Sequence, residues 1–193
     1  SLISDFISAQ SETLTDLTAQ RVACSASERV KALALLEDCI YHQNEVLLAD
    51  LHKFTDIIIT QLLKESPIRE EAITSINEVS SQLMPIEIAS PLAVALYELL
   101  ENSIQHAFTD TVHANYIHVT FTCEQMEGQS ETRYRLTVKD NGKGLPNDID
   151  PQASETTGLA IVHTVAERLS GALEFSSENG TSASLVFTRS ERI

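Results

Sequence analysis

Residues 138–146 read VKDNGKGLP and follow a run of alternating, strand-like residues. A hairpin turn alone would explain Asn141-Gly142, because this dipeptide supplies the positive φ angles that a tight turn needs. It would not explain Gly144, since a second close glycine lets the backbone approach a bulky group. Asp140 at the end of the strand would present a fixed acceptor in a crevice. By itself the stretch favours a turn, and the rest of the chain has to distinguish a turn from a site.

The composition describes a soluble globular chain of one or two domains, with 193 residues, 42% hydrophobic residues, a formal net charge of -15 and a pI near 4.6. So acidic a surface excludes a general binder of nucleic acids or anionic membranes, because the 13 lysines and arginines are scattered. No apolar run is long enough to span a bilayer, and no signal peptide opens the sequence. We therefore expect a cytoplasmic protein without direct membrane contact. The first residue is not Met, which indicates a fragment or a processed product.

The cysteines predict neither a disulfide framework nor a zinc site. There are three of them, Cys24, Cys39 and Cys123, which is an odd number at wide spacing. We expect reduced, buried thiols.

Helical periodicity dominates the first part of the chain, which holds no Pro or Gly before about residue 42. We expect two helices there, over about 2–17 and 20–41. Their apolar stripes are narrow, which favours a helical hairpin that packs against a second copy in a four-helix bundle, and docking on the rest of the chain is the alternative.

The remaining elements predict an α+β fold in which helices cover one face of a mixed sheet. The long helix is expected to begin with Ser90 as N-cap and Pro91 in the first turn. The expected elements are helices at 51–63, 90–106 and 159–169, and strands at 73–79, 116–123, 133–139, 172–176 and 182–188.

One face of the long helix carries an unusual polar stripe. Glu98, Asn102 and Gln105 with His106 follow one another at helical spacing, without a lysine among them. On the helix alone, a solvated polar face is the better interpretation. The opposite, packed side is expected to consist of Ala95, Leu96, Leu99, Leu100, Ser103, Ile104 and Ala107.

The order of the motifs indicates a nucleotide site instead. The amide oxygen of Asn102 suits Mg²⁺, Glu98 suits proton transfer, and His106 can reach a phosphate oxygen. The helix start at Thr157 and Gly158 offers free N–H groups, which a phosphate needs in an acidic protein.

The base would lie on the other side of the same pocket. Asp140 can accept a hydrogen bond from an exocyclic amine such as that of adenine, and Gly142 and Gly144 can admit the edge of the ring. The pocket would lie between the long helix and the sheet.

Four segments of the sequence together resemble the ATP-binding domain of histidine kinases. ELLENSIQHAF (98–108), DNGKG (140–144), TTGLAIV (156–162) and NGT (179–181) look like its asparagine box, its two glycine boxes and its final Gly-Thr box. That domain shares its Bergerat-type α/β sandwich with the ATPases of gyrase, MutL and a heat-shock chaperone. Residues 20–65 are similar to the second dimerisation helix and linker of the histidine kinases with a His-Arg-x-Lys-Asn-Asn type acceptor motif.

The resemblance implies a role for each matching residue. Glu98 would assist the phosphoryl acceptor, Asn102 would bind Mg²⁺, and Asp140 would read adenine. The further ATP contacts that it implies are His106, Gly142, Gly144, Leu145, Thr157, Gly158, Leu159 and Thr181.

The implied protein is the catalytic portion of a sensor histidine kinase. It would transfer the γ-phosphoryl group of ATP to a histidine for relay to a response regulator. Residues 1–45 would be the remnant of the dimerisation domain, with a homodimer formed through its helices, and residues 46–193 would be the ATPase domain.

The acceptor motif itself is absent, and the register of residues 1–10 places the expected acceptor just before Ser1. We interpret His42 and His52 as ordinary surface or capping residues. The same interpretation holds for His113, His118 and His163.

Two further departures concern the phosphate side. Only one glycine stands at Gly158, the segment 145–157 is short, and Gln105 replaces a basic residue whose charge His106 would compensate. These departures predict weaker nucleotide binding.

Two other functions stay open. One is a non-catalytic ATP-binding regulatory module, against which the intact Glu98 and Asn102 argue. The other is an anti-sigma-factor-like serine kinase, which normally lacks helices such as those expected in residues 1–65.

Overall fold

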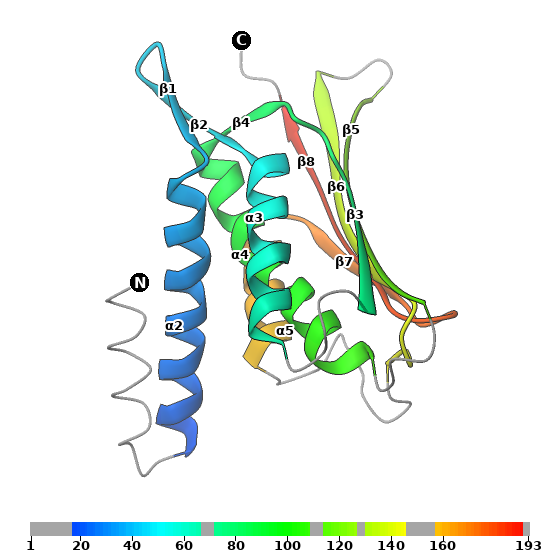
Figure 1. Ribbon diagram of the computed structural model, residues 1–193. Coiled ribbons are helices and arrows are strands. Elements are labelled where there is room, and N and C mark those ends of the chain that lie inside the picture. Colours follow the sequence, from blue (N-terminus) through cyan, green and yellow to red (C-terminus); the bar gives the residue numbers. More distant parts are fainter. Residues whose placement is uncertain (1–16, 67–71, 109–113, 127–129, 146–156, 191–193) are drawn as a thin grey trace.

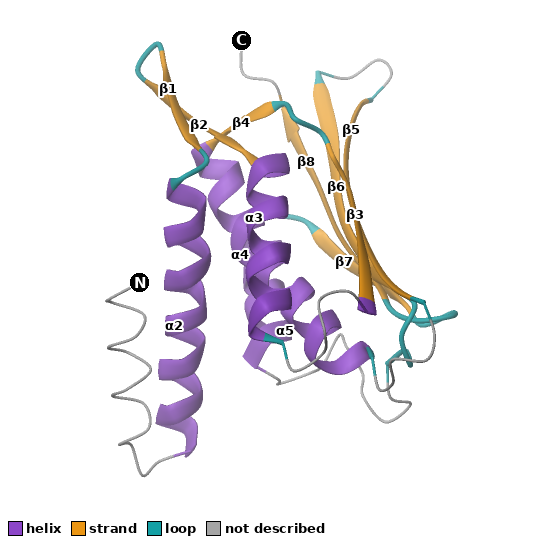
Figure 2. Ribbon diagram, in the orientation of Figure 1, coloured by secondary structure: helices purple, strands orange, loops and turns teal. Residues whose placement is uncertain are grey.

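The computed structural model describes residues 17–66, 72–108, 114–126, 130–145 and 157–190 (Figure 1). A five-stranded sheet is covered on one face by the helices α3, α4 and α5, and α2 lies outermost in the helical layer (Figures 1 and 2). The predicted α+β fold, a mixed sheet with helices on one face, is confirmed.

The described part of the chain forms helices and strands. In chain order they are α2 (Leu17–Glu37), β1 (Ile40–Gln43), β2 (Val46–Asp50), α3 (Leu51–Glu65), β3 (Ile73–Val79), β4 (Leu83–Pro85), α4 (Ile86–Asn102), the π-helix η2 (Ser103–Ala107), β5 (Asn115–Gln125), β6 (Glu131–Asp140), α5 (Thr157–Arg168), β7 (Ala172–Ser176) and β8 (Ser182–Ser190).

The main sheet has the strand order β3-β5-β6-β8-β7. β3 pairs with β5 in parallel, and every other pair in this sheet is antiparallel. Side chains alternate along β6, so that Leu136, Val138 and Asp140 are buried while Arg133 and Lys139 are exposed. The period of two therefore carries Asp140, the last residue of β6, to the helical side of the sheet.

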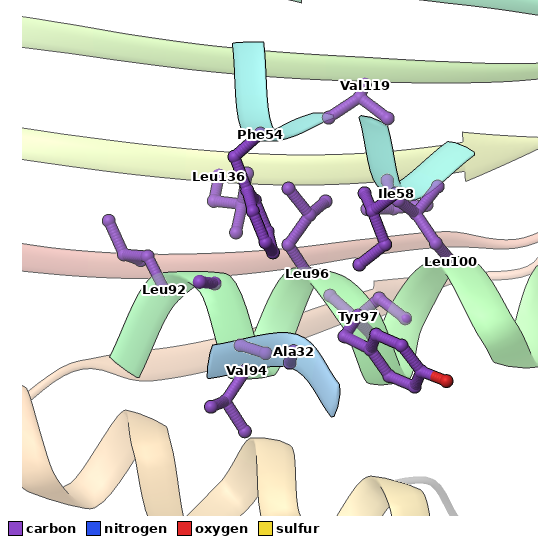
Figure 3. Packing of buried hydrophobic residues seen from close by; sticks show 14 of the residues in the cluster. Ala32, Phe54, Ile58, Leu92, Val94, Leu96, Tyr97, Leu100, Val119 and Leu136 are labelled. Atoms are coloured by element: carbon purple, nitrogen blue, oxygen red, sulfur yellow. The ribbon is translucent and has the colours of Figure 1, made fainter. Parts of the chain in front are cut away.

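The core is built around α4, which is buried on both sides (Figure 3). Leu96 and Leu100 point toward the sheet and meet Phe54 and Ile58 of α3. Tyr97, on the other side of the helix, lies at 2% exposure toward α2. A helix that is apolar nearly all round has to be covered in this way.

α2 packs against the rest of the chain, which was the alternative to packing in a four-helix bundle with a second copy. Ser27, Ala32 and Leu36 are at most 1% exposed, whereas Leu33 on the outer side is 44% exposed. The expected first helix, 2–17, falls almost wholly outside the described residues. None of the described helices has the length and apolar character required to cross a membrane.

The expected end of the second helix was wrong. α2 stops at Glu37, and the chain then forms the hairpin β1–β2, which pairs with β4 in a small antiparallel sheet. Asn44 and Glu45 turn the hairpin with φ angles of 48° and 66°. The hairpin escaped the sequence analysis because this turn has no glycine to indicate it.

The expected start of the long helix was also wrong. α4 begins at Ile86 after Pro85, so Ser90 is not its N-cap and Pro91 lies inside the helix. A proline there removes the hydrogen bond to the carbonyl of Glu87, and its ring crowds that carbonyl. Burial of the surrounding turns outweighs this loss.

The thiols differ from one another. Cys39 is buried, and burial raises the pKa of its thiol, whereas Cys123 is exposed, contrary to the expectation of buried thiols. Cys123 lies near the end of β5, beyond the part of the strand that the helices cover. The side chain of Cys24 lies outside the described residues.

Phe54→Ala should lower the free energy of unfolding by about 3–5 kcal/mol, because it leaves a cavity in the core. Phe54 is fully buried, whereas Ile76 on β3 is 40% exposed and serves as the control. In denaturant unfolding followed by circular dichroism, Ile76→Ala should cost less than about 1 kcal/mol. Equal losses in the two variants would contradict this packing.

Candidate functional site

A cavity of about 330 Å³ opens where α4, η2 and α5 meet the sheet. Its apolar side chains come from helices and strands alike, and its polar ones gather at the end of α4 and after β6. The residues that line it are Leu99, Asn102, Ser103, His106, Ala107, Val138, Asp140, Lys143, Gly144, Leu145, Leu159, Phe175, Thr181 and Ala183.

Asp140 lines this cavity as a carboxylate at 1% exposure. Its Oδ1 accepts hydrogen bonds from the backbone N–H of Gly142 at 2.9 Å and of Thr181 at 3.0 Å. Its Oδ2 accepts one from the hydroxyl of Ser103 at 3.0 Å. A buried carboxylate is tolerated when donors surround it in this way. The three bonds also fix the direction in which the remaining acceptor site points.

Gly142 holds the loop against the helical layer. A Cβ at this position would overlap the backbone carbonyl of Ala107, which accepts a hydrogen bond from Lys143 N–H at 2.9 Å. The glycine thus permits a close approach of two backbones, and it lies behind the cavity rather than in its lining.

Gly144 continues the loop in the left-handed region, with φ of 76°. The next N–H, that of Leu145, donates to Ser177 Oγ at 2.9 Å. Both sides of the loop are therefore tied, one to η2 and the other to the turn after β7.

The last turn of the long helix widens into η2, which places Ser103, His106 and Ala107 along the cavity. Single π-helical turns of this kind are often found at functional sites. His106 is exposed at the rim, whereas Ser103 is buried.

Glu98 and Asn102 face the first turn of α5. Glu98 is 4% exposed, so a merely solvated polar stripe does not describe this part of the helix. A Cβ at Gly158 would lie 3.0 Å from Glu98 Oε2 and 3.3 Å from Asn102 Nδ2. The Nδ2 atom of Asn102 is shielded from solvent and has no hydrogen-bond partner within the part of the chain that the structure describes. Such an atom at the edge of a cavity fits a ligand contact.

The rest of the lining is apolar. Leu99 of α4, Leu159 of α5 and Phe175 of β7 line the same hollow as Val138 and Ala183 of the neighbouring strands. Apolar walls with a few fixed polar groups are typical of sites for flat organic ligands.

The structure brings most of the predicted site residues together. Glu98 and Gly158 lie beside Asn102, Gly142 lies behind the loop, and the side chain of Thr157, the first residue of α5, is outside the described part. The predicted residues in the lining are Asn102, His106, Asp140, Gly144, Leu145, Leu159 and Thr181.

The sequence analysis missed Ser103, Lys143 and Phe175 as cavity residues. A signal existed for Ser103, because it is a hydroxyl on an otherwise apolar helix side next to Asn102. Lys143 stands between the two glycines of the motif, which was a signal for it as well. Phe175 had no signal, since only the packing of β7 beside β8 brings it to the cavity.

Two of the histidines outside the cavity, His52 and His118, make contacts within the described part of the chain. His42 is exposed on β1, not at a helix end, and His52 Nδ1 lies 2.8 Å from the carbonyl oxygen of Val79. His118 Nε2 lies 2.8 Å from Glu78 Oε2. His163 lies within α5, and His113 is outside the described residues.

Comparison with known proteins connects this geometry to a family. Residues 87–191 match the model of the family described as histidine kinase-, DNA gyrase B-, and HSP90-like ATPase. Blue-light-activated histidine kinase 2 of Erythrobacter litoralis (strain HTCC2594) is 31% identical over 90 residues. That match covers 47% of this chain and 24% of the relative, so the chain spans about a quarter of its length.

Solved structures agree with this match. The histidine kinase domain of a blue-light-activated histidine kinase from Erythrobacter litoralis superposes with a TM-score of 0.69 at 25% identity, over 96% of this chain and 83% of that one. The mycobacterial sensor histidine kinase MprB shares the fold, with a TM-score of 0.54 at 18% identity over 73% of this chain and 97% of that one.

Gly142→Ala should destabilise the protein by about 1–3 kcal/mol, because the added methyl group overlaps the Ala107 carbonyl. Lys143→Ala, one position on at an exposed side chain, is the control and should change the melting temperature little. Thermal unfolding gives the melting temperatures of the two variants. A melting temperature of Gly142→Ala equal to that of the unaltered protein would contradict the close approach of the two segments.

Proposed function

This chain belongs to the family of histidine kinase-, DNA gyrase B- and HSP90-like ATPases, and from that premise we propose that its cavity binds ATP for phosphoryl transfer to a histidine. The protein would be the catalytic portion of a sensor histidine kinase. The observation that carries the proposal is the fixed carboxylate of Asp140 in an apolar cavity.

The cavity suits a purine in size and in chemistry. A volume of about 330 Å³ falls at the lower end of the range for sites that hold small organic ligands. A ring between Leu159, Val138 and Phe175 would present its exocyclic amine to Asp140. A charged acceptor makes such a bond stronger than a neutral one does.

The phosphate side suits a cation that travels with the nucleotide. Among the described residues no three His, Cys, Asp or Glu side chains gather to hold a metal ion. Mg²⁺ is usually bound by one or two protein oxygens together with substrate phosphates. A half-turn of the Asn102 amide exchanges its oxygen and nitrogen, so the unpartnered Nδ2 position fits an oxygen ligand. When bound, the cation would neutralise charge on the phosphates.

The first turn of α5 would complete the phosphate site. Thr157 and Gly158 open the helix beside Asn102, and N–H groups at a helix start attract anions. His106 and Lys143, both exposed at the cavity, would add positive or polar contacts. In a chain with a net charge of -15, these local groups are what makes a polyphosphate ligand acceptable.

Glu98 would take part in the transfer itself. As a histidine nitrogen bonds to the γ-phosphorus, the bond from that phosphorus to the bridging oxygen breaks and ADP leaves. The imidazole has to lose a proton in this step, and the carboxylate of Glu98 would accept it. The acceptor histidine is proposed to precede Ser1.

The partners follow from the same proposal. A response regulator would receive the phosphoryl group. A homodimer would form through the N-terminal helices of residues 1–45, and on α2 the exposed Leu33 belongs to the side that is available for such a contact. Residues 46–193 would form the ATPase domain, in a cytoplasmic protein.

Asp140→Asn should weaken ATP binding by about 10- to 100-fold in titration calorimetry, because a charged acceptor is replaced by a neutral amide. Asp38→Asn makes the same chemical change at an exposed residue near the end of α2 and should leave the affinity unchanged. Equal affinity of the Asp140 variant and the unaltered protein would remove the purine assignment.

A longer native chain that includes the residues before Ser1 should become labelled from ATP carrying a labelled γ-phosphate. The label should be lost in acid and kept in base, as expected for phosphohistidine. Asn102→Ala should reduce labelling at least about tenfold, through loss of the cation ligand. Gln43→Ala on β1 is the control for loss of an amide. A label that survives acid would contradict histidine transfer and point to a serine kinase.

A further inference from the structure

Ser103 and Asp140 form a buried pair inside the cavity. The serine hydroxyl donates to Asp140 Oδ2 at 3.0 Å, and the two residues are 8% and 1% exposed. Both line the cavity, so the pair lies next to the space that a ligand would fill. The sequence analysis assigned Ser103 to the packed side of the helix, and the resemblance implied no role for it.

The hydrogen bonds that Asp140 makes within the described part of the chain leave one acceptor position open. An ionised carboxylate has about four lone-pair sites on its two oxygens. Oδ1 accepts from Gly142 N–H and Thr181 N–H, and Oδ2 accepts from Ser103. One site on Oδ2 is left for a donor from the cavity. Because the Ser103 hydroxyl fills the other site on Oδ2, the carboxylate has a fixed orientation and can accept one further hydrogen bond.

Ser103 itself is held firmly. It lies at the junction of α4 and η2, where its N–H points to the carbonyls of Leu99 and Leu100. The residue as a whole is 8% exposed, so little of its side chain faces bulk solvent. Its proton is committed to Asp140, which a threonine at the same position would also permit.

We propose that Ser103 is a positioning residue that sets the base selectivity of the cavity. By saturating one side of Asp140 Oδ2, it leaves a site that accepts a purine with an exocyclic amine and rejects a purine with an oxo group at the same position. A carbonyl oxygen offers no donor to the open site and would place two acceptors against each other. This inference rests on the proposed nucleotide function.

Removal of the Ser103 hydroxyl changes which ligand groups can bind beside Asp140 Oδ2. Without it, Oδ2 has two open sites and room for a water molecule. Water both donates and accepts, so it can bridge the carboxylate to a carbonyl as well as to an amine. The affinity for the oxo purine should then rise relative to that for the amino purine.

The test compares ATP with inosine triphosphate, which carries an oxo group in place of the amine. Dissociation constants for both are measured by titration calorimetry on the unaltered protein, Ser103→Ala and Ser103→Thr. We expect the unaltered protein to prefer ATP, Ser103→Ala to lower that preference by about 3- to 10-fold, and Ser103→Thr to restore it.

Ser184→Ala is the matched control. Ser184 is also 8% exposed, its hydroxyl pairs with that of Thr137 at 2.8 Å, and neither residue lines the cavity. This variant loses a buried serine hydroxyl and should keep the unaltered ratio of the two affinities. A purely structural role of Ser103 would lower stability without moving that ratio.

The outcomes separate the two proposals. An unchanged ratio in Ser103→Ala, with ATP still bound by the unaltered protein, would overturn the role of Ser103 alone. A changed ratio that Ser103→Thr fails to restore would overturn it too, because the hydroxyl would not be the cause. Binding of neither nucleotide by the unaltered protein would contradict the nucleotide function and the selectivity with it.

Discussion

The buried carboxylate of Asp140 is the constraint on which the rest of the site depends. At 1% exposure its charge is costly unless donors surround it. The donors come from three places: the loop after β6 through Gly142, the residue just before β8 through Thr181, and the start of η2 through Ser103. The same three bonds that stabilise the charge therefore hold the helical layer, the sheet and the loop in register at the cavity. A shift of the helix along the sheet would break at least one of them.

The second requirement is the double burial of α4. Leu96 and Leu100 fix one side against the sheet, and Tyr97 and its neighbours fix the other side against α2 (Figure 3). Glu98 and Asn102 lie on this tightly packed helix, so the packing of α4 helps to set their positions relative to α5. A rigid element is what a site needs when a ligand has to meet several groups at once.

The hydrophobic core includes residues that lie before the span matched by the family model. The match begins at residue 87, within α4, and ends just after β8. Elements before it still complete the core, because Phe54 and Ile58 of α3 cover the sheet and Leu36 of α2 is 1% exposed. β3 also lies before the matched span, and it covers the edge of β5 by parallel pairing. Elements that precede the matched residues, α2, α3 and β3, therefore complete the core and the sheet of the ATPase fold in this protein.

The sequence by itself determined the strands of the main sheet, α3, and the residue types of the site, because alternation, helical spacing and glycine motifs are local properties. It did not determine the hairpin β1–β2, whose Asn44-Glu45 turn lacks the glycine that usually follows asparagine in such turns, or the start of α4, where packing overrides the effect of Pro91. Only the tertiary structure decided that Glu98 is buried and that Ser103 donates to a carboxylate 37 positions away. Contacts between distant segments depend on how whole elements pack, and no local pattern encodes the resulting distances.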